Sequence, residues 1–224
     1  MVLSSGSGQM GPVLDVSREG KTRMRVGARP VVRTGGSEGN TRLTAATAAI
    51  LLVLLAAEGL TLLAIGPLVS AHVFIGMLLV PLVGLKLAST GYRFLRYYTG
   101  HREYRADGPP HPLLRALGPV LVLATAALFA SGVALVALGP EGGVVLGLHK
   151  ASFVVWVAAM SAHVLAHVLR VPRLAAADWR SDEPLPGSSL RRWLLAGSLV
   201  AGLILAVATV HLAGPWHQFV GLDG

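Results

Sequence analysis

The sequence has no cysteine among its 224 residues. This absence excludes disulfide bonds, thiolate-bound metals, cysteine-held iron–sulfur clusters and covalently attached c-type haem. Charged residues are also scarce, at 13% of the chain compared with roughly 25% in an ordinary soluble domain. The sequence has no dinucleotide-binding glycine fingerprint and no flavin motif, so any chemistry on a soluble substrate is expected to belong to another chain.

Apolar residues dominate what is present. Hydrophobic residues make up 53% of the sequence, and the mean hydropathy is +0.63. They lie in blocks of about twenty or more, the length needed to cross a hydrocarbon layer of ~30 Å. The sequence therefore predicts an all-α integral membrane helical bundle with about five transmembrane helices. The expected helices cover 43–65, 68–96, 113–138, 144–170 and 190–213.

The charges are unevenly distributed along the chain. The net charge is +8, and 17 of the 19 Lys and Arg residues fall within 1–42, 93–115 and 170–192. A positive excess on alternate loops is typical of loops that stay in the cytoplasm. We interpret the charge as a topology signal and expect no nucleic acid partner. Residues 1–40 predict a disordered basic cytoplasmic tail, and 41–224 a multi-pass domain in the cell membrane, with the lipid bilayer as its main partner.

Three of the eight histidines share the fourth predicted helix. His149 and His163 are 14 residues apart, which corresponds to about 21 Å of rise and side chains within about 40° of one face. His167 returns to nearly the same face. Ionisable side chains inside a bilayer are costly, which makes them functional candidates. A helix with an imidazole near each membrane surface could give one axial ligand to each of two stacked haems.

The second predicted helix offers one partner for these histidines. His72 is expected at the same membrane depth as His149, and this pair is the predicted ligand set for a haem iron. Fourteen residues after His72 the helix carries Lys86 in place of a histidine. Lys86 could contact a haem propionate, act as an unusual ligand or extend to the membrane surface.

Two glycines of the third predicted helix follow the same spacing. Gly118 and Gly132 are 14 residues apart and would let the helix approach a flat macrocycle closely. The same glycines could instead serve helix–helix packing. Glu58 on the first helix is, with Lys86, the charged residue furthest from water. Glu58 could pass protons to or from a quinone, stay protonated, or pair with Lys86 if the helices tilt favourably.

The paired histidines and the glycines resemble those of membrane b-type cytochromes. This group includes the cytochrome-b subunits of quinone-linked hydrogenases and formate dehydrogenases, and ferric-reductase-like haem proteins. The stretches RFLRYYTGHREYR (93–105), GPPHPLLRALGP and LHKASFVVW are also similar to a group of actinobacterial membrane proteins. The resemblance covers roughly residues 68–170. It implies haem b, one group or two, and electron transfer between a quinone pool and a partner redox subunit.

The chain departs from the two-haem members of this family. Those proteins supply four histidines from two helices, whereas here His72 and His149 match one pair and the second pair has no obvious partner on the second predicted helix. His101, His111 and His217 are expected at the surface, and His211 at the membrane boundary. If an inner haem is bound, His111 is the histidine expected to supply its ligand from the opposite side.

Two other kinds of function stay open. One is a non-haem membrane scaffold or assembly subunit whose histidines are structural. The other is a divalent-metal transporter, which the scarcity of acidic residues near the middle of the membrane makes the weaker alternative. If the chain belongs to an enzyme, it is at most the electron-transfer subunit of an oxidoreductase.

Overall fold

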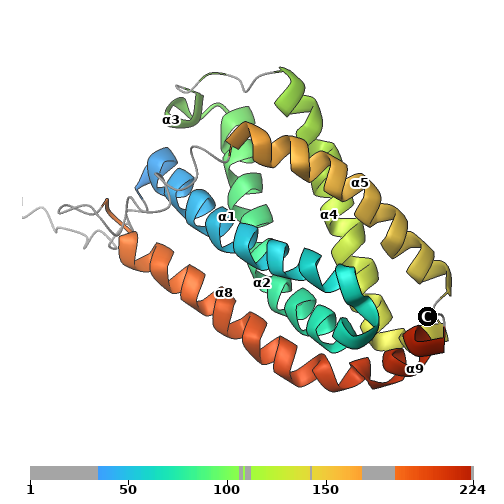
Figure 1. Ribbon diagram of the computed structural model, residues 1–224. Helices are drawn as coiled ribbons and strands as arrows, with labels where there is room; N and C mark the ends of the chain where they lie inside the picture. The colour runs from blue at the N-terminus through green and yellow to red at the C-terminus, as the bar shows by residue number, and fades with distance from the viewer. Residues whose placement is uncertain (1–34, 106–107, 109–111, 142, 168–184, 223–224) are drawn as a thin grey trace, which may run out of the picture. The chain divides into compact units, whose positions relative to one another are not determined.

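The computed structural model describes residues 35–105, 108, 112–141, 143–167 and 185–222, all of which belong to one compact unit, Val32–Gly224. The described residues are helical throughout apart from short turns, and they contain no strand, so the predicted all-α class is confirmed (Figure 1). The five long helices are α1 (Gly36–Thr61), α2 (Ile65–Tyr98), α4 (Pro112–Leu138), α5 (Gly143–His167) and α8 (Ser188–Thr209). The short ones are η1 (Leu62–Ala64), α3 (Arg102–Arg105), η2 (Gly139–Glu141), η3 (Val210–Ala213) and α9 (Gly214–Leu222).

Four helical stretches in the described residues are long and apolar enough to cross a membrane. They are Gly36–Tyr98, Arg115–Glu141, Gly143–Ala166 and Ser188–Val220. The first has 63 residues and comprises α1, η1 and α2, which fold back on each other as a hairpin (Figure 1). Large apolar side chains such as Leu63 and Val144 are more than four-fifths exposed, as expected where the surrounding solvent is lipid. The chain is a multi-pass membrane protein.

Side-chain bonds fix the register of the α1–α2 hairpin. Near one end, Lys86 Nζ donates a hydrogen bond to the Thr44 carbonyl at 3.0 Å. Near the turn, Thr61 of α1 contacts His72 of α2. Between these polar contacts the hairpin encloses fully buried leucines, including Leu79. Polar side chains therefore join the helices where they would otherwise face lipid without a partner.

Helix α8 packs against α2 almost backbone to backbone. A Cβ atom built on Gly202 would lie 2.3 Å from the Leu78 carbonyl oxygen. Only glycine allows this approach, which is the usual device for close helix packing in membranes.

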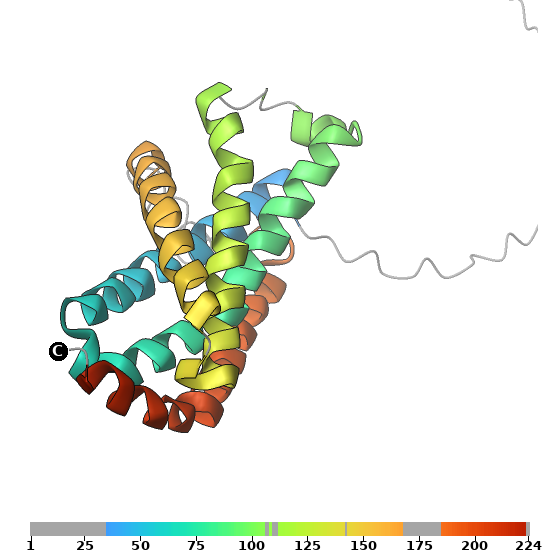
Figure 2. The same ribbon diagram turned by 90° about the vertical axis from the view of Figure 1, so that its right-hand side faces the viewer.

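Helices α4 and α5 form a second antiparallel pair (Figure 2). A buried hydrogen bond from Trp156 Nε1 to Thr125 Oγ1, 3.0 Å long, joins them. The α1–α2–α8 group and the α4–α5 pair are thus two parts of one bundle, and the candidate site lies between them.

Two boundaries differ from the sequence prediction. Helix α1 begins at Gly36, so residues 36–40 are helical where a disordered tail was expected. An ion pair between Glu38 and Arg42, 2.7 Å long, spans one turn there and supports the extra helix. The last predicted helix ended at 213, but the residues that follow it form α9, where Trp216 is buried against Val69 and Leu135. The other long helices begin within three residues of the predicted positions.

Candidate functional site

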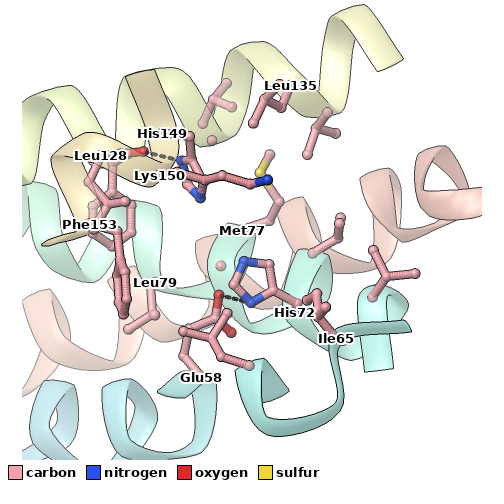
Figure 3. A pocket seen from close by; sticks show the side chains of 18 of the residues that line it. Glu58, Ile65, His72, Met77, Leu79, Leu128, Leu135, His149, Lys150 and Phe153 are labelled. Atoms are coloured by element: carbon pink, nitrogen blue, oxygen red, sulfur yellow. Dashed lines mark hydrogen bonds and ion pairs between the residues drawn. The ribbon is translucent and has the colours of Figure 1, made fainter. Parts of the chain in front are cut away.

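A cavity of about 770 Å³ lies between the α1–α2 hairpin and the α4–α5 pair (Figure 3). Its walls are mainly aliphatic and aromatic, with Leu79, Phe153 and Trp156 among them. Helix α9 contributes Trp216 and Phe219, so the C-terminal helix forms part of the wall. The volume is in the range of cavities that hold organic ligands and cofactors.

His72 of α2 and His149 of α5 face each other across this cavity. Their ring centroids are 6.4 Å apart, and the ring planes are nearly perpendicular, at 85°. Figure 3 shows one nitrogen of each ring bonded to the surrounding protein and the other turned toward the opposite histidine. The structure therefore brings together the two residues that the sequence paired by membrane depth.

Hydrogen bonds indicate the tautomer of His72. Its Nδ1 lies 2.9 Å from Thr61 Oγ1 and 3.1 Å from Glu58 Oε1. The Thr61 hydroxyl donates its proton to the backbone carbonyl of Glu58 at 2.5 Å. The hydroxyl oxygen of Thr61 is therefore left to accept a hydrogen bond from the His72 ring. This arrangement places the ring proton on Nδ1 and leaves the lone pair on Nε2.

His149 is held by the same pattern on the other side of the cavity. Its Nδ1 lies 3.1 Å from both the Leu128 carbonyl oxygen and Ser131 Oγ. The Ser131 hydroxyl donates to the same Leu128 carbonyl at 3.0 Å. A carbonyl can only accept, so the His149 proton also lies on Nδ1. Both imidazoles thus present Nε2 lone pairs toward the cavity, which is the form that ligates a metal.

Glycines leave space for the His149 ring and for the Glu58 carboxyl group. A Cβ atom on Gly132 would lie 3.1 Å from His149 Cε1, so a larger residue would displace the ring. On the opposite wall, a Cβ atom on Gly76 would lie 3.3 Å from Glu58 Oε1. Gly132 is therefore close to the site, as the sequence suggested, whereas a Cβ on Gly118 would meet nothing within 4 Å.

The remaining predicted residues lie elsewhere. Lys86 bonds to Thr44 between α1 and α2 and does not line the cavity, and it is not paired with Glu58. His163 lies further along α5, outside the cavity wall. The His167 side chain and His111 lie outside the described parts of the structure. Among the described residues, no group of three or more His, Asp or Glu side chains could hold a metal ion.

Sequence reasoning missed the groups that hold the histidines. Thr61, Ser131 and the Leu128 carbonyl are ordinary helical residues, and nothing in their type marks them. The sequence pointed to Glu58, but the only side-chain partner it suggested was Lys86, and that only if the helices tilt favourably. The hairpin register could have corrected this, because Glu58 and His72 each lie seven residues from Ile65, and the bonded pair Thr44 and Lys86 each lie 21 residues from it.

The fold and the cavity together define an all-α, multi-pass membrane protein with two facing histidines inside the bundle. No family model matches the chain, and no curated protein or solved structure matches it either.

Proposed function

We propose that this chain is a membrane-embedded b-type cytochrome that binds one haem b between α2 and α5. The observation that supports it most strongly is the pair of Nε2 lone pairs facing each other from His72 and His149. Haem iron has two positions left open by its macrocycle, and two opposed imidazoles complement them. When bound, the haem would supply reversible one-electron transfer.

The spacing of the two rings fits this ligand set. A metal bound to both imidazoles through bonds of about 2 Å separates the ring centroids by roughly 6 Å. The observed separation of His72 and His149 is 6.4 Å. The apolar walls would exclude water from the bound group, and Gly132 provides close approach beside His149.

The Nδ1 bonds have a defined role in this proposal. Thr61 and Glu58 orient His72, while Ser131 and the Leu128 carbonyl orient His149. Hydrogen bonds to the ring nitrogen that does not bind the metal fix the tautomer and the ring plane of metal-binding histidines. The rings are thereby prepared as ligands before any cofactor enters.

The charge on the described helix ends supports an orientation. Arg42, Arg93 and Arg191 lie at one end of the bundle, where the starts of α1 and α8 meet the end of α2. Lys150, which lines the cavity near the other end, could meet an acidic propionate of haem. We propose that the basic end faces the cytoplasm of a cell membrane, with the N-terminus inside. The cavity would then lie in the outer half of the membrane.

The position of the cavity inside the membrane suggests the electron partners. A site inside the bilayer is accessible to lipid-soluble carriers, so we propose exchange between a quinone pool and a partner redox protein. The chain would act as the electron-transfer subunit and not as the site of substrate chemistry.

Histidine variants test the proposal. His72→Ala and His149→Ala should each remove the haem absorption bands from the purified protein, because a six-coordinate iron would lose one axial ligand in an apolar cavity. His163→Ala is the matched control on α5 and should keep the bands. Retention of the bands in both cavity variants would contradict the proposal and favour a scaffold with structural histidines.

A further inference from the structure

Glu58 is the only acidic side chain among the described residues that line the cavity. Its Oε1 lies 3.1 Å from His72 Nδ1, and its side chain is 16% exposed. The second oxygen, Oε2, is buried and has no hydrogen-bond partner. A half-satisfied buried carboxyl group is costly to keep in a membrane, so its position calls for a functional explanation.

The two histidines differ in the second hydrogen-bond partner of Nδ1. In both, Nδ1 contacts a hydroxyl group that donates a hydrogen bond to the backbone carbonyl three residues before it. The remaining partner of His149 is the neutral Leu128 carbonyl, whereas that of His72 is the Glu58 carboxyl group. A carboxylate acceptor makes the imidazole a more basic ligand than a carbonyl acceptor does.

We infer that Glu58 is a positioning residue that acts through His72 to lower the reduction potential of the bound haem. This inference rests on the proposed function. A more electron-donating ligand and a nearby negative charge both stabilise the oxidised, more positive state of the iron. As a carboxylate that accepts from His72 Nδ1, Glu58 would supply both effects without contacting the metal itself.

Lys150 provides an opposing charge in the same cavity. The titratable groups that line the described cavity wall are Glu58, His72, His149 and Lys150. A positive charge disfavours the oxidised iron, so Lys150 should raise the potential that Glu58 lowers. Loss of these two charges should therefore shift the reduction potential in opposite directions.

The test is a redox titration of purified full-length protein at one fixed alkaline pH, at which the Glu58 carboxyl group is ionised. Glu58→Gln keeps the shape and a neutral acceptor but removes the charge, and its midpoint potential should rise above that of the unaltered protein. The low-spin ferric electron paramagnetic resonance signal should move with it, because the ligand strength of His72 changes. Lys150→Gln should shift the midpoint potential downward.

Two further variants separate charge from general disturbance. Glu38→Gln removes the same charge from an exposed position near the start of α1, and it should leave the potential unchanged. Glu58→Asp keeps the charge and should stay closer to the unaltered protein than Glu58→Gln does.

The outcomes distinguish this inference from the function on which it rests. Equal potentials for the unaltered protein and Glu58→Gln, with haem present in both, would overturn the role of Glu58 and leave the cytochrome proposal intact. An equal rise in Glu58→Asp and Glu58→Gln would also overturn it, since charge would not be the cause. Absence of haem from the unaltered protein would instead overturn the cytochrome proposal.

Discussion

Along the helix axes, the bundle has one half near the α1–α2 turn and another near the start of α1. The same helices run through both halves, but the side chains and the space between the helices differ. Near the α1–α2 turn, His72 faces His149 across a cavity of about 770 Å³. Fourteen residues further along α2, Lys86 turns to α1 and bonds to the Thr44 carbonyl. His163 stands at the corresponding position on α5, but neither Lys86 nor His163 lines the cavity.

This difference shows that histidine spacing on one helix does not define a site. The half with His72 and His149 combines three features: an imidazole on each facing helix, space between them, and acceptors that hold both Nδ1 atoms. In the other half, Lys86 stands at the matching position of α2 and instead joins α2 to α1. The second haem that the spacing allowed stays a prediction without a described cavity to support it.

The largest effect is expected from Gly132 on α4. Gly132→Leu should abolish haem binding, because its added side chain would collide with the His149 ring, already 3.1 Å from a Cβ atom. Gly118→Leu is the matched control, since a Cβ there meets nothing within 4 Å. Haem content per chain is the measurement. Equal content in the two variants would show that the Gly132 contact does not shape the site.

A smaller effect is expected from the cavity wall supplied by α9. Trp216→Ala should reduce stability by about 3 kcal/mol, as expected for the loss of a buried tryptophan, while both ligands stay in place. Thermal unfolding in detergent, with loss of haem absorbance as the signal, measures this change. Trp193→Ala removes a tryptophan that is 75% exposed and should have little effect. Similar losses in both variants would mean that α9 does not close the cavity.

The smallest effect is expected in the other half of the bundle. Lys86→His restores the 14-residue histidine spacing on α2, but haem content should stay the same because this position faces Thr44 on α1. Lys86→Met should cost about 1 kcal/mol through the lost hydrogen bond and should also keep the haem. A second equivalent of haem in Lys86→His would show that the two halves differ only in this side chain.

The sequence predicted the long helices well because hydrophobic runs of membrane length are a strong signal. It missed the early start of α1, where a local ion pair extends the helix into polar sequence. It also missed α9, because burial of Trp216 depends on Val69 and Leu135, which come from distant parts of the chain. Both errors arise because a hydropathy scale scores each residue separately and takes no account of contacts between side chains.

The candidate site was predictable only in part. Helical rise places His72 and His149 at one depth, so their proximity follows from sequence once the helices are known to be neighbours. Their hydrogen-bond partners do not follow, because Thr61 and Ser131 are common helical residues and the Leu128 partner is a backbone carbonyl. The role of Glu58 depends on the hairpin register, which only the folded chain reveals.

The central claim is that the facing histidines bind haem b, and the absorption spectrum of the purified, unaltered protein tests it most directly. Because the iron would have two imidazole ligands, reduction with dithionite should produce the sharp visible bands of six-coordinate haem b. Quantitative haem extraction should give one group per chain. A colourless protein, prepared from cells supplied with haem and correctly inserted in the membrane, would contradict the account.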